Sequence, residues 1–205
     1  MAVTQIQLYN FRSYNHRTVI LDPGVTLIVG PNGSGKTNIL EALYVLATTK
    51  SFRARDEALI NQGHEVLRVV AVADEAEYSF AYQKQPTVAK KVTRDGVKKS
   101  LRSHIGTVPV VLFEPGDLQL LAGSPSARRG YIDTILCQTD PEYLQALNEY
   151  KRALRQRNAL LRDHGFVPAD VLFAWNVQLT GPAIILRNKR QEFIAYLQSR
   201  LPSLY

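Results

Sequence analysis

The chain has 205 residues, of which 45% are hydrophobic and 21% are charged; these proportions exclude a disordered chain and fit a soluble globular protein. Its 25 Lys and Arg residues outnumber its 18 Asp and Glu residues, and the net charge of +7 favours an anionic partner. The single cysteine, Cys137, excludes an intrachain disulfide. Residues 1–14 lack the apolar core of a secretory signal, and the uncharged run 171–186 is shorter than the roughly 20 residues of a membrane span. We therefore expect a cytoplasmic protein that does not contact a membrane.

Strands are predicted at the start of the chain. Residues 3–9 alternate between apolar and polar side chains, which is typical of a half-buried strand. Residues 17–29 contain two β-branched runs on either side of the turn Asp22-Pro23-Gly24, which predicts strand, turn and strand. The second of these runs, 25–29, leads directly into a glycine-rich loop.

That loop is a complete phosphate-binding motif, G-x-x-x-x-G-K-[ST], and apolar residues at helical spacing follow it over 38–47. Its glycines let the backbone wrap an anion, and the first turn of the helix supplies unpaired N–H groups. Lys36 would contact the β- and γ-phosphates, and the Thr37 hydroxyl would bind Mg²⁺. The motif predicts ATP and Mg²⁺ as ligands of Gly30, Pro31, Asn32, Gly33, Ser34, Gly35, Lys36 and Thr37.

Residues 51–106 are predicted to form a small, mostly antiparallel β lobe. Three strands are expected at 65–73, 77–83 and 88–94, followed by a hairpin turn at Asp95-Gly96. Seven basic residues and one acidic residue lie between Lys84 and His104. Such a hairpin could follow DNA phosphates, although lysines on an edge strand also serve simply to prevent aggregation.

A core strand at 108–113 and a helix at 126–137 are expected next. A P-loop ATPase also needs a hydrophobic strand ending in acidic residues that hold Mg²⁺. Residues 69–75 and 110–114 imitate such a strand, but we interpret both as strands that end in turns, at Asp74-Glu75 and Pro115-Gly116. No catalytic residue is therefore predicted.

The last part of the chain is predicted to be a pair of helices. Asp140-Pro141-Glu142 has the pattern of a helix start, the helix is expected to run to about residue 163, and Gly165 is placed to end it. A partner helix is expected from about residue 169, interrupted at Pro182. Lys151 and Arg155 lie on one face of the first helix, where they could contact DNA or simply solvate the helix.

Six stretches of the chain together resemble the head of the ATPases related to structural maintenance of chromosomes, and within them the RecF family of bacterial recombination mediators. They are residues 8–14, 30–44, 50–53, 113–118, 123–133 and 154–158. The resemblance implies an α/β fold, a P-loop NTPase head of the ABC/SMC type with a mixed sheet, an antiparallel β lobe and an inserted α-helical arm. The head would comprise residues 1–137, with a P-loop core at 1–50, the β lobe at 51–106 and a core strand and helix at 107–137. The arm would comprise residues 138–205.

The same resemblance implies a function. Such proteins clamp DNA as an ATP-bound homodimer in recombinational repair, replication-fork maintenance and the damage response, and help to load recombinase with RecO and RecR partners. It implies that Arg12 contacts the nucleotide. DNA contacts are also predicted: at Arg53, which could touch DNA or a partner, at Lys90, Lys91, Arg94, Lys98 and Lys99 from the charge of the basic hairpin, and at Lys151 and Arg155, because relatives hold duplex DNA across their heads and arms.

The chain also departs from the pattern of these relatives. Many of them carry a Mg²⁺-sensing glutamine where this chain has Val110, Val111 and Leu112, and either Glu114 or Gln119 could take that role. Neither a Leu-Ser-x-Gly-Gln-like signature nor a second ATPase motif is found, so we expect an N-terminal portion with weak ATP binding and negligible hydrolysis by itself. A weak DNA-dependent ATPase is expected of the full-length protein. The alternatives are the head of an overcoming-lysogenisation-defect-type nuclease and a transporter-type ATPase subunit.

Overall fold

The computed structural model describes residues 2–120, 122–163 and 167–204. The chain divides into two compact units, residues 1–114 and 115–205, which we call the head unit and the helical unit. This division places residues 115–137 with the helices, whereas the sequence assigned them to the head. The expected helix end at Gly165 lies outside the described residues.

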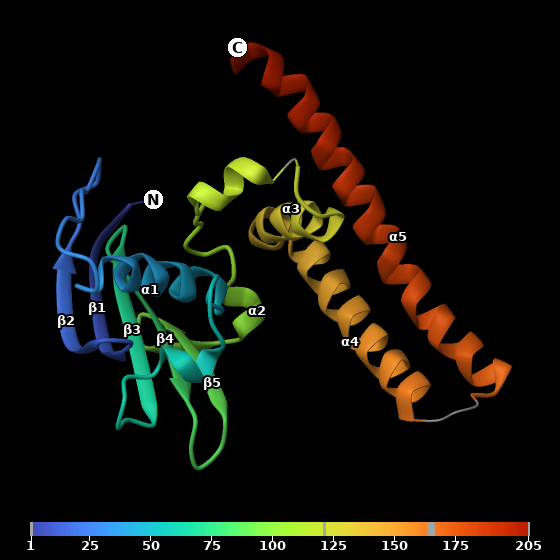
Figure 1. Cartoon of the computed structure of the whole chain (residues 1–205), viewed down its shortest axis with the longest axis horizontal. Coiled ribbons are helices and arrows are strands. Elements are labelled where there is room, and N and C mark those ends of the chain that lie inside the picture. Colours follow the sequence, from blue (N-terminus) through green and yellow to red (C-terminus); the bar gives the residue numbers. More distant parts are fainter. Residues whose placement is uncertain (1, 121, 164–166, 205) are drawn as a thin grey trace. The chain divides into compact units, whose positions relative to one another are not determined.

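The head unit is built on one six-stranded sheet in the order β2-β1-β3-β4-β5-β6, in which every pairing is antiparallel (Figure 1). Its strands are β1 (Val3–Phe11), β2 (Tyr14–Ile20), β3 (Val66–Ala73), β4 (Ala76–Gln83), β5 (Ala89–Arg94) and β6 (Val97–Lys99). Because β1 pairs with β3, the expected P-loop core and β lobe share a single sheet.

Short turns connect the later strands, as the sequence predicted. Asp74 and Glu75 join β3 to β4 with positive φ angles of 45° and 66°, and Asp95 and Gly96 join β5 to β6 with 51° and 75°. Two successive positive φ angles match the right-handed twist of a hairpin, and Asp, Asn and Gly tolerate them best. The interpretation of Asp74-Glu75 as a turn is therefore confirmed.

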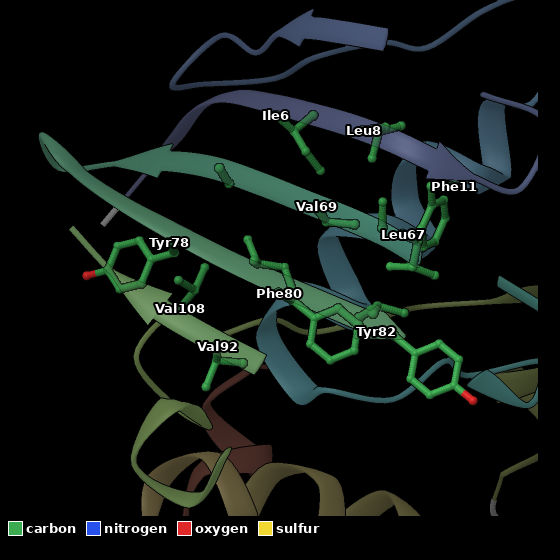
Figure 2. Close-up of a cluster of buried hydrophobic side chains, with 14 of the residues drawn as sticks. Ile6, Leu8, Phe11, Leu67, Val69, Tyr78, Phe80, Tyr82, Val92 and Val108 are labelled. Carbon is green, nitrogen blue, oxygen red and sulfur yellow. The ribbon is translucent and has the colours of Figure 1, made fainter. Parts of the chain in front are cut away.

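Helix α1 (Lys36–Thr48) covers one face of this sheet and packs on β1, β3 and β4. The core between them is apolar and includes Ile6, Leu8, Val69 and Phe80, none of which is exposed (Figure 2). Two short helical segments, η1 (Asp56–Leu59) and α2 (Leu101–His104), complete the unit. The packing of α1 on the sheet thus fixes the helix whose N-terminus the loop at residues 30–35 adjoins.

Two predicted core strands are absent from the head unit. Residues 25–29 and 108–113 belong to none of the strands of the described residues, so those two predictions were wrong. Val25 and Leu27 are 92% and 82% exposed, and Phe113 is 73% exposed. A strand requires a neighbour to accept and donate its backbone hydrogen bonds, and β propensity alone does not supply one.

The helical unit contains α3 (Pro125–Thr139), α4 (Pro141–Asp163) and α5 (Ala169–Arg200), with the short helices η2 (Pro115–Gln119) and η3 (Leu201–Leu204). Asp140 caps α4 as predicted, because its Oδ1 accepts from the backbone N–H groups of Glu142 and Tyr143 at 2.9 and 3.0 Å. The core of the helical unit contains Leu136, Tyr143 and Leu147, with Leu186 and Phe193 from α5.

Helix α5 continues through Pro182, so the predicted interruption was wrong. By length and composition residues 169–204 are long and apolar enough to cross a membrane, and they are the one such stretch in the described part of the chain. Leu186 and Phe193 of this helix pack against α4, whereas only 6% of its most apolar window is buried.

A polar triad links the three long helices of this unit. Arg190 of α5 donates to Oδ1 of Asp133 on α3 from Nε and Nη2, at 3.0 and 2.7 Å. The hydroxyl of Tyr143 on α4 donates to the same oxygen. Burial and the hydrogen bond to Asp133 raise the pKa of Tyr143 well above its ordinary value, so this hydroxyl stays protonated. The triad therefore fixes which faces of α3, α4 and α5 meet.

Candidate nucleotide and nucleic-acid site

The phosphate-binding loop lies at the N-terminus of α1 and is open to solvent. Gly35 is the N-cap of α1, and no acidic residue occupies the first turn. Residues 31–34 and Thr37 are exposed. The Lys36 ammonium donates to the carbonyl oxygens of Gly30 and Pro31, both at 2.7 Å. This arrangement suits an anion, because the backbone N–H groups at a helix start carry partial positive charge and the nearby lysine ammonium carries a full one.

Gly35 is required by its surroundings. Its φ is +92°, and a Cβ built on it would lie 2.5 Å from the hydroxyl oxygen of Tyr14 and 3.1 Å from Oγ of Ser13. The Tyr14 hydroxyl donates to the carbonyl oxygen of Ser34 at 3.3 Å. Tyr14, at the start of β2, therefore packs directly against the loop and leaves no space for a side chain at position 35.

The residues present fit ATP and Mg²⁺ by type. Lys36 and the loop N–H groups can neutralise phosphates, and the exposed Thr37 hydroxyl is an oxygen ligand of the kind that Mg²⁺ takes in P-loop sites. No group of three or more His, Cys, Asp or Glu residues that could hold a metal occurs among residues 2–120, 122–163 and 167–204.

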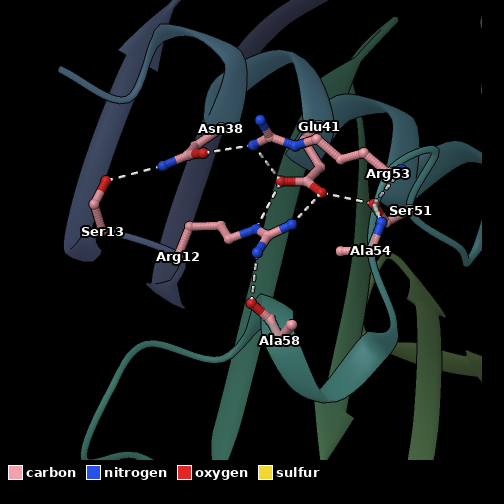
Figure 3. Close-up of polar contacts among 8 residues, drawn as sticks. All are labelled: Arg12, Ser13, Asn38, Glu41, Ser51, Arg53, Ala54 and Ala58. Atoms are coloured by element: carbon pink, nitrogen blue, oxygen red, sulfur yellow. Dashed lines mark hydrogen bonds and ion pairs between the residues drawn. The ribbon is translucent and has the colours of Figure 1, made fainter. Parts of the chain in front are cut away.

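A buried carboxylate lies on α1, the helix that follows the loop (Figure 3). Glu41 of α1 is fully buried. Its carboxylate accepts hydrogen bonds from Nε and Nη2 of Arg12 at 2.8 and 2.7 Å, from Nη2 of Arg53 at 2.8 Å and from the Ser51 hydroxyl at 2.6 Å. Arg12 also donates from Nη1 to the carbonyl oxygen of Ala58 at 2.8 Å. One acid thus joins the β1–β2 turn, α1 and the loop after α1.

The charge of Glu41 is maintained by these partners. Burial would raise the pKa of its carboxyl, but the hydrogen bonds from Arg12, Arg53 and Ser51 outweigh burial and lower the pKa to about 2. This residue was not predicted from the sequence. Its signal was an acid in a predicted amphipathic helix at a position next to the apolar residues Ala42 and Val45, all three of which are buried.

The basic residues of the predicted hairpin do not form one cluster. Lys90 is only 18% exposed, donates to the carbonyl oxygen of Thr49 at 2.7 Å and pairs with Asp56 at 2.8 Å. Arg94 lies over the Tyr78 ring at 5.5 Å. In the ladder Lys99 is opposite Val92 and Lys98 is opposite Thr93.

Opposite residues of a ladder lie on the same face of a sheet, and successive residues alternate. Lys90, Arg94 and Lys99 therefore share the face of the buried Val92, which belongs to the core under α1. Lys91 and Lys98 lie on the other face with Thr93 and are exposed. The predicted DNA contacts are thus divided between two faces.

The two predicted contacts on the arm are exposed on α4. Lys151 and Arg155 point to solvent, and Arg155 lines an open pocket with Asn158, Leu161 and Arg162. These residues form a basic surface of the helical unit. The side chain of Gln119, one of the two candidates for the Mg²⁺-sensing role, lies outside the described side chains.

Comparison with known families identifies the class of this head. The family model described as RecF/RecN/SMC N terminal domain matches residues 2–103. A solved structure on the ATP-driven dimerization and DNA-stimulated activation of SMC ATPases covers 66% of this chain with a TM-score of 0.50 at 23% identity, and shares the fold. The chain is therefore a P-loop ATPase head of the RecF/RecN/SMC class, as the sequence predicted.

Similarity to individual proteins narrows this class. RecF of Agathobacter rectalis is 34% identical over 211 residues, and RecF of Thermomicrobium roseum is 38% identical over 223 residues. They align with 100% and 98% of this chain and with 58% and 56% of their own lengths. The solved structure of the recombination mediator protein RecF-ATP in the RecFOR pathway is 28% identical with a TM-score of 0.86, covering 97% of this chain and 55% of that chain. The chain belongs to the RecF family and spans little more than half the length of these relatives.

Proposed function

We propose that this chain binds ATP with Mg²⁺ through its P-loop and contacts DNA as part of an ATP-dependent protein of recombinational repair and replication. The observation that carries the nucleotide part is the open loop at the start of α1, with Lys36 and Thr37 beside it. A RecF relative of the same fold has been solved with ATP, which supports this assignment.

The finer steps of the proposal come from the family. In the whole protein the ATP-bound head would pair with a second copy, clamp DNA and help RecO and RecR partners to load recombinase, and DNA would stimulate a weak ATPase. The RecF relative solved with ATP is a recombination mediator of the RecFOR pathway, which supports these partners. Within the site, Lys36 would neutralise phosphate charge and Thr37 would orient Mg²⁺. Membership of the RecF family supports this function over a nuclease head or a transporter subunit.

The nucleotide part is tested by titration with a fluorescent ATP analogue. Lys36→Ala removes the ammonium that lies on the loop, and we expect it to weaken binding at least tenfold. Lys84→Ala is the matched control, because it removes the same charge from an exposed residue outside the loop. Equal affinities for Lys36→Ala and wild type would contradict the assignment.

The DNA part is tested separately with labelled duplex DNA at about 50 and about 200 mM salt. Contacts with several phosphates make the affinity fall steeply with salt. We expect Lys151→Gln with Arg155→Gln to weaken binding severalfold and to reduce the salt dependence. Binding that does not depend on salt, or that neither substitution changes, would exclude α4 as a DNA contact.

A further inference from the structure

Arg53 connects the P-loop helix to an exposed basic loop. The Nη2 atom of Arg53 donates to Oδ1 of Asn38 at 2.7 Å and to Oε2 of Glu41 at 2.8 Å, and both of these partners lie on α1 (Figure 3). The guanidinium also lies 5.8 Å from the centre of the Phe52 ring, which itself makes an edge contact with Tyr44. One edge of the guanidinium is therefore held by α1.

The opposite edge of Arg53 makes no hydrogen bond within the described residues, although Glu114 lies near enough to interact with the guanidinium electrostatically. The two hydrogen bonds account for both protons of Nη2, and the side chain is 37% exposed, so Nε and Nη1 are the groups that can donate to an external partner. Nε and an amino group of arginine form a fork that matches the oxygens of a phosphate or carboxylate.

Exposed cations lie on the loop that carries Arg53. Lys50 and Arg55 are exposed there, and both line an open surface pocket. Of the nearby acids, Asp56 is paired with Lys90, Glu57 lines the same pocket, and Glu114 interacts electrostatically with Arg53. The loop thus presents three exposed cations within six residues.

A buried acid behind such a loop needs an explanation. Removing a carboxylate from water is costly, and a buried ion pair is often no more stabilising than an apolar side chain of similar size. What Glu41 does achieve is geometric, because one rigid carboxylate fixes the orientation of Arg53 from behind. A side chain that is already ordered loses less entropy when it binds a ligand.

We propose that Glu41 is a positioning residue which, with Asn38, holds Arg53 so that its outer edge binds a phosphate of DNA. This inference rests on the proposed DNA-binding function. Asn38 directly follows Thr37, so the same helical turn carries the predicted Mg²⁺ ligand and a direct partner of the DNA-contacting arginine. The inference assigns a role to a residue that the sequence pattern did not single out.

The sign of one substitution separates this role from simple electrostatics. Glu41→Gln removes a negative charge, so charge alone would strengthen DNA binding. If Glu41 positions Arg53, the same substitution weakens binding, because the guanidinium is no longer held. We expect the loss to be about threefold to tenfold, and the slope of log affinity against log salt to fall by about one phosphate contact.

A double-mutant cycle measured by fluorescence anisotropy with a labelled DNA duplex tests whether Glu41 acts through Arg53. Arg53→Gln is expected to weaken binding about tenfold, and adding Glu41→Gln to it is expected to have no further effect. Arg55→Gln is the matched control, since it removes the same charge from the same loop. There, the effect of Glu41→Gln is expected to persist in full.

Each outcome decides the matter. Effects of Glu41→Gln and Arg53→Gln that simply multiply, or tighter binding by Glu41→Gln, would overturn the inference while leaving DNA binding intact. No binding of wild type to duplex DNA would remove the DNA part of the proposed function and the inference with it, whereas ATP binding is judged by its own titration. If thermal unfolding shows that Glu41→Gln does not fold, Asn38→Ala takes its place in the cycle, because it removes one partly exposed partner of Arg53.

Discussion

Gly35 shows how a single residue determines the shape of the nucleotide site. The position combines a φ of +92° with the Tyr14 hydroxyl only 2.5 Å from a would-be Cβ. Gly33 has a similar φ of +82° but no atom within 4 Å of a would-be Cβ. A comparison of substitutions at these two glycines therefore distinguishes backbone strain, present at both, from steric conflict, present only at Gly35.

We expect Gly35→Ala to destabilise the head unit more than Gly33→Ala. Both substitutions carry the cost of about 1 kcal/mol or more for a left-handed backbone, and only the first also meets Tyr14. Thermal unfolding of the two variants without nucleotide measures the difference. Adding Tyr14→Ala should recover part of the loss in Gly35→Ala; equal melting temperatures for Gly35→Ala and Gly33→Ala would contradict this.

Glu41 predicts an acid-dependent loss of stability. Its pKa is lowered from 4.5 to about 2 in the folded chain, so the unfolded state binds the proton more readily. The stabilisation is complete above about pH 4.5 and is lost as the pH falls towards 2, with a magnitude of about 3 kcal/mol. The difference in unfolding free energy between wild type and Glu41→Gln should therefore shrink over this range. A difference independent of pH would show that Glu41 is not ionised in the folded chain.

At the scale of elements, α5 is where the helix propensity of the local sequence and the tertiary packing oppose each other most clearly. The helix contains Gly181 and Pro182 in succession, and both are poor helix formers in a helix interior. Proline lacks the N–H that would bond to the carbonyl oxygen four residues earlier. The helix nevertheless continues, because Leu186 and Phe193 beyond this point pack against α4. Tertiary packing therefore compensates for a locally unfavourable sequence.

We expect Gly181→Ala and Pro182→Ala to stabilise the helical unit. No atom lies within 4 Å of a Cβ at position 181, so alanine should add about 1 kcal/mol, and alanine at position 182 should add about 1 to 3 kcal/mol. Urea unfolding followed by the fluorescence of Trp175, the single tryptophan, measures both. Destabilisation by Pro182→Ala would mean that packing of the proline ring contributes more to the free energy of unfolding than the missing hydrogen bond costs.

At the scale of the whole molecule, each unit has its own core. The apolar cluster of the head unit lies entirely within residues 3–108, and that of the helical unit lies within residues 132–193. Independent cores are the usual basis of separate cooperative units.

We therefore expect two unfolding transitions. The β-sheet signal in circular dichroism would report on the head unit, which holds every strand of the described residues, and Trp175 on α5 would report on the helical unit. Gly35→Ala should shift only the first transition, and Pro182→Ala only the second. Transitions that coincide in every variant would show that the chain unfolds as one cooperative unit.

Local sequence chemistry was sufficient for much of this molecule. The phosphate-binding loop, the hairpin turns at Asp74-Glu75 and Asp95-Gly96, and the cap at Asp140 are determined by a few neighbouring residues. These features were predicted because glycine, aspartate and proline have strong local backbone preferences that hold in most contexts.

The tertiary structure decided what depends on distant partners. The apolar run at 25–29 has the composition of a strand but no neighbour to pair with among the described residues, and Pro182 lies in a helix that packing maintains. Strand register divided the basic hairpin between two faces, which net charge along the sequence could not show. Glu41 meets Arg12 and Arg53 across 29 and 12 residues of chain, so only folding could turn an ordinary helix glutamate into the buried partner of two arginines.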